Sequence, residues 1–319
     1  MQQAYLKATN PVSADNFGKV LAISGDTAVV GAPYEDTGLA NSGAVYVFVR
    51  SGTNWSQQAK LKSSQPGNAD NFGFSVAIAG DTIVVGAPNE DSNATGIDGN
   101  QNDNSSGDAG AAYVFVRSGT NWSQQAYLKA ANTGAGDNFG DTVAISTNTI
   151  VVGAPFEDSD ATTINGSPGN NNKADAGAAY VFVRSGSSWS QQAYLKASNS
   201  GSGDVFGDEV AISGDTVVVG AFGEDSSSTG VNSSANESAS SAGAAYVFVR
   251  NGTNWSQQAY LKASNPGADD SFGSSLAIED QTIVVGAPWE DSSSTGINTT
   301  ANESASNAGA AYVFVRSGT

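Results

Sequence analysis

The strongest constraint on the fold of this chain is that one motif occurs five times. Phe-Gly followed by a short apolar stretch recurs at Phe17, Phe72, Phe139, Phe206 and Phe272. Each copy continues into a Val-rich segment ending in Gly-Ala and then into Tyr-Val-Phe-Val-Arg. A motif that recurs several times along a chain in this way is typical of propellers and solenoids, in which each repeat is one structural unit. We therefore expect residues 1–319 to form a single domain of five equivalent units.

Each repeat contains four short apolar segments separated by turn residues. In the repeat that begins at Trp122, these segments are WSQQAYLKA, FGDTVAI, TIVVGAP and AAYVFVR. Val, Ile, Tyr and Phe dominate the segments, and Gly, Asn, Asp and Ser lie between them, which indicates β-strands. The Tyr-Val-Phe-Val-Arg strand is apolar on both faces, so we expect sheets that stack against other sheets.

Antiparallel four-stranded sheets with two apolar faces pack as the blades of a β-propeller. We predict an all-β, five-bladed β-propeller with one blade for each of the five repeats. The chain opens with a fourth-strand sequence at residues 2–8 and ends on a third strand at residues 312–316. We expect the N-terminal strand to complete the last blade and close the ring. The alternative is an open array within a longer protein.

The pattern from Phe17 to Pro33, with its four near copies, resembles the FG-GAP repeat of the integrin α-subunit N-terminal propeller. The resemblance covers essentially the whole chain, and it implies an extracellular propeller that binds protein or glycan ligands through its upper face. Integrin propellers have more blades, and their calcium loops lie between the first and second strands. Here that link is a tight turn such as Ser-Gly-Asp-Thr, too short to wrap a cation. The family's metal sites are therefore not expected here.

Composition excludes several classes of function. The net charge of -18, with only 13 Lys and Arg residues, argues against nucleic acid or anionic membrane as a partner. No apolar run is long enough to span a bilayer. Cys and His are absent, which excludes disulfides, thiolate or imidazole metal sites, and Ser-His or Cys-His catalysis. Low lysine content and closely similar repeats favour a secreted or cell-surface bacterial protein whose partner is a glycan or an extracellular protein.

Carboxylates recur in every repeat, on the loops that we expect at the upper face. An Asp stands two residues before each Phe-Gly, and a Glu-Asp pair follows each Gly-Ala-Pro or Gly-Ala-Phe. They either accept backbone N–H bonds and solvate the loops, or they bind calcium, which prefers clustered oxygen ligands. The best calcium candidate has oxygen-bearing side chains at alternate positions, namely Asp98, Asn100, Asn102, Asp103 and Asp108.

Two positions vary between repeats that are otherwise nearly identical. We do not expect the blade fold to dictate such residues, and we expect both positions near the upper mouth of the central channel. Aromatic side chains there suit sugar stacking and protein contacts, and charged groups would orient a ligand. Neutral drift at a solvated rim is the alternative. The candidate ligand-binding residues are Tyr34, Asn89, Phe156 and Trp289 after Gly-Ala-Pro, and Lys19, Phe74, Asp141 and Asp208 after Phe-Gly.

The tryptophans at the start of the outer strands, Trp55, Trp122, Trp189 and Trp255, are expected to pack at the blade edges. We predict a binding or adhesion module without enzymatic activity. A structural spacer in a larger surface protein is the alternative. A glycoside hydrolase using Asp141, Asp208 and Glu209 is disfavoured, because most carboxylates are the same in every repeat and catalysis needs two unlike ones.

Overall fold

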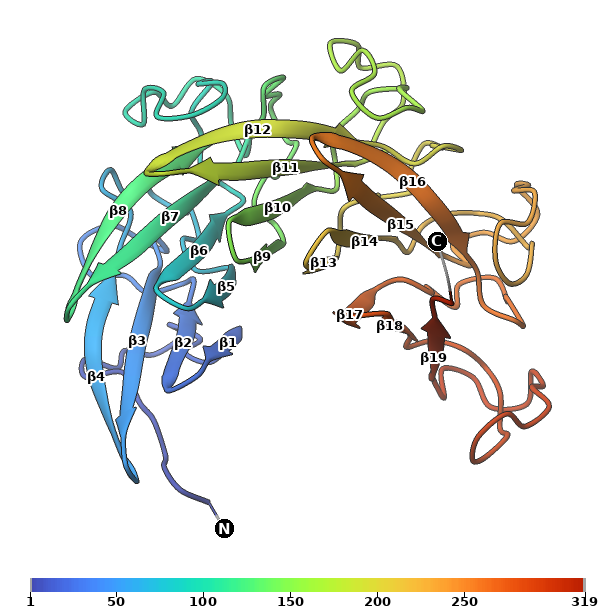
Figure 1. Ribbon diagram of the computed structural model, residues 1–319, viewed down its shortest axis with the longest axis horizontal. Coiled ribbons are helices and arrows are strands. Elements are labelled where there is room, and N and C mark those ends of the chain that lie inside the picture. Colours follow the sequence, from blue (N-terminus) through green and yellow to red (C-terminus); the bar gives the residue numbers. More distant parts are fainter. Residues whose placement is uncertain (1, 318–319) are drawn as a thin grey trace. The chain divides into compact units, whose positions relative to one another are not determined.

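The computed structural model describes residues 2–317, and it is built from strands only, β1 to β19 (Figure 1). Met1, Gly318 and Thr319, which belong to the expected domain, lie outside the described residues. Among residues 2–317, no helix is long and apolar enough to cross a membrane.

The strands form five antiparallel sheets, one for each repeat, and strands adjacent in sequence are neighbours in each sheet. Four sheets have four strands and the last has three, which confirms the all-β fold of five propeller blades. The first sheet contains β1 (Leu21–Ser24), β2 (Thr27–Ala32), β3 (Ala44–Ser51) and β4 (Asn54–Leu61). The second contains β5 (Ser75–Ala79), β6 (Thr82–Ala87), β7 (Ala111–Ser118) and β8 (Asn121–Leu128).

The remaining sheets follow the same order. The third contains β9 (Val143–Ser146), β10 (Thr149–Ala154), β11 (Ala178–Ser185) and β12 (Ser188–Leu195). The fourth contains β13 (Val210–Ser213), β14 (Thr216–Ala221), β15 (Ala244–Asn251) and β16 (Asn254–Leu261). The fifth contains β17 (Ser275–Glu279), β18 (Thr282–Ala287) and β19 (Ala310–Val315).

The chain divides into two compact units, residues 1–152 with 181–191 and residues 153–180 with 192–319, which we describe separately. In the first unit, apolar side chains of the first two sheets form one core that includes Val45, Val85 and Tyr113. In the second unit, the fourth and fifth sheets share a core that includes Val247 and Val285. Each core lies between two sheets, as expected for strands that are apolar on both faces.

The Phe-Gly motif packs one sheet against the next. The ring of Phe72 lies edge-on to Tyr113 and Phe115, with centroid distances of 5.3 and 5.9 Å. Gly73 has a φ of +91°, and a Cβ atom there would lie 2.7 Å from the carbonyl oxygen of Ala44 in the first sheet. Glycine is therefore required by both the backbone conformation and the close approach.

The tryptophans pack at the blade edges, as predicted. Where β3 pairs with β4, the register shifts between Val47 and Phe48, so that Gln58 is an extra residue in a β-bulge. The side-chain oxygen of Gln58 accepts a hydrogen bond of 2.8 Å from the indole N–H of Trp122 in the second sheet. Trp189 and Trp255 donate in the same way to Gln125 and Gln192, at 2.9 and 2.8 Å.

The expected ring closure by the N-terminal strand is not found. Residues 2–7 form no strand, and the fifth sheet ends with β19 as its third strand. The segment packs on the first sheet instead: Gln3 accepts a 3.0 Å hydrogen bond from Trp55, and Leu6 and Ala8 join the core around Tyr46. A match to the outer-strand sequence therefore does not ensure that the segment forms a strand.

Candidate functional site

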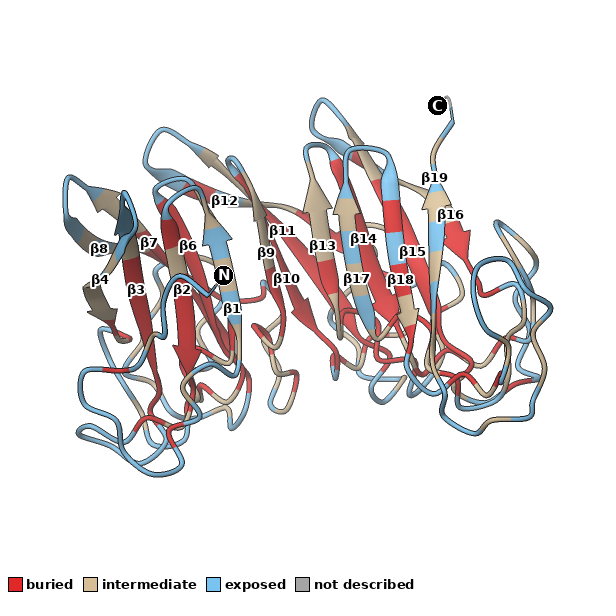
Figure 2. Ribbon diagram, turned by 90° about the horizontal axis from the view of Figure 1, so that it is seen from below, coloured by how far each residue is buried: buried red, intermediate tan, exposed pale blue. Residues whose placement is uncertain are grey.

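Each sheet has short hairpin turns at one end and long loops at the other (Figure 2). The candidate residues belong to the loop end. The loops there are organised by the Glu-Asp pairs, and the two members of a pair have different roles.

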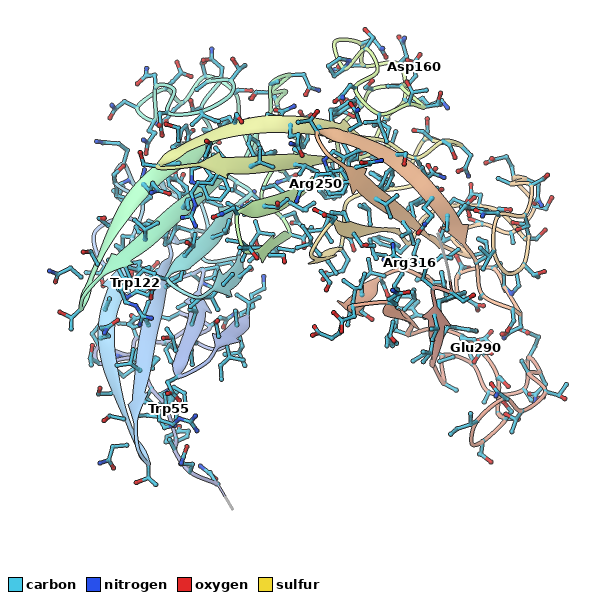
Figure 3. The ribbon with its side chains drawn as sticks, in the orientation of Figure 1. Trp55, Trp122, Asp160, Arg250, Glu290 and Arg316 are labelled. Carbon is cyan, nitrogen blue, oxygen red and sulfur yellow. The ribbon has the colours of Figure 1, made fainter. Side chains whose placement is uncertain are left out.

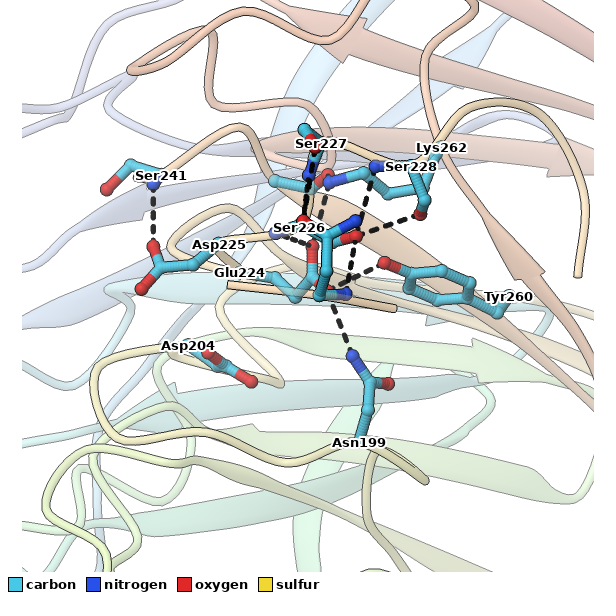
Figure 4. A network of polar contacts seen from close by, with 12 residues as sticks. Asn199, Asp204, Glu224, Asp225, Ser226, Ser227, Ser228, Ser241, Tyr260 and Lys262 are labelled. Carbon is cyan, nitrogen blue, oxygen red and sulfur yellow. Dashed lines mark hydrogen bonds and ion pairs between the residues drawn. The ribbon is translucent and has the colours of Figure 1, made fainter. Parts of the chain in front are cut away.

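The glutamate of each pair is buried, and in the first four repeats it holds the outer strand of its own repeat. In the fourth repeat, Glu224 accepts hydrogen bonds from the Tyr260 hydroxyl at 2.6 Å and from Lys262 Nζ at 2.7 Å (Figure 4). It also accepts the backbone N–H of Ser226 at 3.1 Å. Lys262 is itself fully buried and donates to the carbonyl oxygen of Gly243 at 2.6 Å. This buried network ties the loop to β16.

The same network recurs in the second and third repeats. Glu90 pairs with Tyr127 and Lys129, and Glu157 pairs with Tyr194 and Lys196. Burial lowers the pKa of Lys129, and the attraction of Glu90 opposes that shift. The expectation that these glutamates solvate the loops is wrong, because each one is enclosed with a lysine that neutralises it.

The first repeat uses two lysines in place of one. Lys60 and Lys62 approach Glu35 at 2.6 and 2.8 Å. Burial alone would raise the pKa of Glu35, but the hydrogen bonds from the two lysines lower it to about 2. Glu35 is therefore ionised throughout the range in which the protein would function.

The aspartates satisfy backbone N–H groups, which confirms the turn interpretation. Asp225 accepts the backbone N–H of Ser241 at 2.8 Å, and Asp91 accepts that of Asp108 at 2.9 Å. The aspartates before Phe-Gly act in the same manner, as when Asp204 accepts the N–H of Gly201 at 2.6 Å. Burial raises the pKa of Asp204 to about 7. These carboxylates therefore shape the loops.

Side chains of the candidate calcium residues also accept hydrogen bonds from backbone N–H groups. Asp98 accepts the N–H of Tyr127 at 2.9 Å, and Asp103 accepts that of Asn93 at 3.1 Å. Asn100 accepts the N–H of Asn102 at 3.1 Å. Asn165 and Asn232 hold Tyr194 and Tyr260 as Asp98 holds Tyr127, so an uncharged amide serves equally well.

These residues do not fit a calcium shell as they are arranged. Calcium requires six or more converging oxygens. One side-chain oxygen of each of Asp98, Asn100 and Asp103 instead accepts a backbone N–H. Within residues 2–317, no group of three or more acidic side chains could hold a metal ion. Calcium binding here remains a prediction for a melting experiment.

In the first unit, the structure brings three candidate ligand-binding residues together. The Lys19 ammonium lies 3.5 Å from the centroid of the Phe74 ring and 5.4 Å from that of Tyr34. Asn71 fixes this arrangement by donating a 3.3 Å hydrogen bond to the carbonyl oxygen of Pro33, immediately before Tyr34. Lys19 remains exposed, so the cluster presents one cation on aromatic surface.

Two other candidates of the first unit make hydrogen bonds within their loops. Asn89 donates a 2.7 Å hydrogen bond to Asp108, which we considered as a calcium ligand. Asp141 is half-buried, and its backbone N–H donates to the carbonyl oxygen of Asn138 at 3.0 Å. Asn89 is thus committed to the loop of its own repeat.

In the second unit, the two aromatic candidates are exposed. Phe156 and Trp289 are 40% and 56% exposed, whereas the Phe-Gly phenylalanines Phe206 and Phe272 are fully buried. Asp208 is half-buried, and burial raises its pKa to about 6. In this unit, the aromatic residues after Gly-Ala-Pro are therefore open to solvent, whereas the phenylalanines of Phe-Gly lie in the core.

The repeat pattern and the sheets agree with one protein family. The profile of the FG-GAP repeat matches residues 1–48, 55–115, 122–182, 189–248 and 255–314. The chain belongs to the FG-GAP repeat family. A comparison with curated proteins finds no match. In this FG-GAP protein, the named motif residues build the sheet interfaces, and of the varying residues beside them Lys19, Phe156 and Trp289 are exposed.

Sequence reasoning missed the buried lysines and tyrosines that hold the loops. The signal was present, because Tyr-Leu-Lys occurs near the end of the outer strand in three repeats that also carry the Glu-Asp pair. A buried lysine needs a counter-charge. Five loop glutamates beside recurrent lysines would have suggested the pairing.

Proposed function

We propose that this FG-GAP protein is a binding module that recognises a glycan or a protein through the residues following Gly-Ala-Pro and Phe-Gly. The observation that carries the proposal is the outward exposure of Phe156 and Trp289, whose bulk contributes little to the sheet cores. Large exposed aromatic side chains are favoured at sites of sugar stacking and at protein hot spots. The Lys19 cluster adds a positive group suited to orienting a partner.

We further propose that the protein acts in adhesion outside the cell, either secreted or displayed on the surface. The strongly acidic composition supports a soluble partner over nucleic acid or an anionic bilayer. We assign no catalytic role to Asp141, Asp208 or Glu209, and we expect no hydrolysis in a glycosidase assay.

The test is binding to a glycan array and to immobilised extracellular proteins. We expect saturable binding that falls at least tenfold, or about 1.4 kcal/mol, in Trp289→Ala or Phe156→Ala. Tyr5→Ala is the matched control, because Tyr5 is an exposed aromatic residue outside the proposed surface. Equal binding by all three variants would contradict the proposed surface.

A structural spacer is the second candidate. It is favoured by the repeated use of loop carboxylates to hold backbone and lysine groups, as at Glu224 and Asp225. A spacer would give no saturable binding on either array. The two proposals therefore predict opposite results in the same experiment.

A further inference from the structure

The hairpin turn that joins the first two strands of each sheet differs in the third repeat. In four repeats this turn carries an acidic residue, whereas the third repeat has Ser-Thr-Asn-Thr at residues 146–149. A cleft of about 580 Å³ lies at this turn, and all of its lining residues belong to the first unit. They include Ala79, Asp81, Thr82, Gln125, Asn148 and Arg184. The cleft is at the hairpin end of the sheets, opposite the loops of the proposed function (Figure 2).

The first feature of the cleft is an arginine that has no carboxylate partner. In the fourth repeat, Arg250 forms an ion pair with Asp215, and its Nε donates to that carboxylate at 2.7 Å (Arg250 is labelled in Figure 3). In the third repeat, the equivalent Arg184 donates instead to the side-chain oxygen of Asn148, from Nε at 2.9 Å and from Nη2 at 2.6 Å. Among residues 2–317, no carboxylate forms an ion pair with Arg184. The corresponding pairs of the first two repeats are Arg50 with Asp26 and Arg117 with Asp81.

The Arg184 side chain is held in place and still has donors to offer. Its Nη1 donates to the Thr82 hydroxyl of the second sheet at 3.0 Å, and its guanidinium lies 5.2 Å from the centroid of the Trp189 ring. An arginine has five N–H groups, and the contacts with Asn148 and Thr82 use three of them. One N–H therefore remains on each terminal nitrogen, and a bidentate contact with a carboxylate needs two.

The second feature is a backbone N–H without the acceptor that other repeats provide. The Ser24 hydroxyl of the first sheet accepts the N–H of Gly80 in the second sheet at 3.1 Å. The same contact joins the fourth and fifth sheets, also at 3.1 Å. The equivalent residues at the cleft are Ala79 and Thr147, and alanine has no hydroxyl. Among residues 2–317, the Thr147 N–H finds no acceptor, so it is open to a ligand in the cleft.

The charge and lining of the cleft restrict the kind of ligand. Arg117 and Asp81 neutralise each other, which leaves Arg184 as the one uncompensated charge among the lining residues. The net charge of -18 disfavours a polyanion, whereas a single carboxylate matches a single arginine. The cleft is much larger than a carboxylate, and the side chains of Thr82, Gln125 and Asp81 suit hydroxyl groups. A ligand with one carboxylate and several hydroxyl groups fits both requirements.

We propose that this cleft binds a sugar acid, meaning a pyranose ring that carries one carboxylate. The carboxylate accepts the two remaining N–H groups of Arg184 and the backbone N–H of Thr147. The hydroxyl groups bind Asp81, Gln125 and the Asn148 amide. The site uses none of the residues in the proposed function, so the two proposals can succeed or fail separately.

The test is isothermal titration calorimetry of the full chain with sodium galacturonate at low salt. We expect one saturable site for this probe. Galactose, which lacks the carboxylate, and acetate, which lacks the hydroxyl groups, should each bind at least about tenfold more weakly. Added salt should weaken galacturonate binding, since it screens a partly exposed charge contact.

Protein variants locate the site. Asn148→Asp gives Arg184 the carboxylate that three other repeats have, so it should fold normally and weaken galacturonate binding at least about tenfold. The matched control Asn54→Asp adds the same charge at an exposed position that does not line the cleft, and it should leave binding unchanged. Ala79→Ser, which supplies an acceptor for the Thr147 N–H, should weaken binding about threefold.

Three outcomes would overturn the proposal. The first is no saturable binding of galacturonate, or equal affinity for galacturonate and either galactose or acetate. The second is an equal loss of affinity in Asn148→Asp and Asn54→Asp, which would show that net charge governs binding. The third is binding that Trp289→Ala abolishes and Asn148→Asp preserves, which would assign the sugar to the surface of the proposed function.

Discussion

The fourth and fifth sheets have almost the same sequence but very different burial (Figure 2). β14 is buried along its whole length, whereas β18 alternates between exposed and buried residues. β15 is buried over its first five residues, and β19 alternates throughout. The fourth sheet has its apolar residues covered on both faces, and the described part of the fifth sheet is covered on one. Burial in this fold is therefore a property of neighbouring sheets as much as of the strand sequence.

The two sheets also differ in charge compensation. Glu224 and Glu290 occupy equivalent positions and share two hydrogen-bond partners, but only Glu224 pairs with a lysine. An ion pair that is buried costs desolvation energy for both members, so its main effect appears when one member is removed. The same substitution should thus destabilise the protein much more in the fourth sheet than in the fifth.

The largest expected effect tests this difference directly. Glu224→Gln leaves Lys262 buried without a counter-charge, which should lower the free energy of unfolding by about 3 kcal/mol or more. Glu290→Gln removes a buried charge that has no cation and should change stability by less than about 1 kcal/mol, or raise it. Urea unfolding of both variants measures the difference. Equal destabilisation would show that the lysine does not distinguish the two sites.

The next effect tests whether neighbouring sheets account for burial. Val247 in β15 is 3% exposed, and the equivalent Val313 in β19 is 65% exposed. Val247→Ala should cost about 2 kcal/mol through lost apolar burial and a residual cavity, whereas Val313→Ala should cost less than about 0.5 kcal/mol. Urea midpoints of both variants give the comparison. A large effect at Val313 would mean that another surface covers β19 in solution.

The sequence predicted the sheets well because their signals are local. Alternating and doubly apolar strands, two-residue turns and the Phe-Gly glycine each follow from a few adjacent residues, as at Phe72 and Gly73. The buried lysine pairs were missed because the partners lie far apart in the sequence, with Glu224 and Lys262 separated by 38 positions. A charged residue just after a strand is expected to be exposed until its partner is known.

The calcium candidate was also proposed from a local pattern, without knowledge of the distant groups that contact it. Oxygen-bearing side chains at alternate positions, such as Asp98 and Asn100, are a local signal, but backbone N–H groups compete for the same oxygens. In this loop the donors include Tyr127, which is 29 residues from Asp98. The N-terminal segment is a second case in which the local sequence did not reveal the distant contacts. Its sequence matches an outer strand, but Leu6 and Ala8 pack on the first sheet.

A smaller effect concerns pH. The fourth repeat has Asp208 where the fifth has Ser274, and burial raises the Asp208 pKa to about 6. Between about pH 4 and pH 6, the unfolded carboxyl loses its proton while the folded one keeps it, so the native state becomes less stable as pH rises. Asp208→Ser should remove this decrease in the free energy of unfolding. We expect the decrease to be about 1 kcal/mol after allowance for the partial exposure of Asp208.

Melting temperatures from pH 4 to 8 measure this effect. The gain in stability of Asp208→Ser over the parent chain should be absent near pH 4 and should reach its full value above pH 7. Asp280→Asn, which neutralises an exposed carboxyl near the other end of the sheets, serves as the control. A gain that is equal at all pH values would show that the substitution acts through packing instead of through the proton.

The smallest effect distinguishes hydrogen bonding from calcium binding in the second repeat. Asp98 performs the task that Asn232 performs in the fourth, accepting a tyrosine backbone N–H at 2.9 Å in both cases. Asp98→Asn should therefore change stability by less than about 0.5 kcal/mol, whereas Asp98→Ala should cost about 1 kcal/mol through the lost acceptor. If the carboxylate serves only this hydrogen bond, calcium and chelator should give the same melting temperature for the parent chain and for Asp98→Asn. A calcium-dependent rise that Asp98→Asn abolishes would instead assign the loop to the cation, because a ligand that binds only the native state must stabilise it.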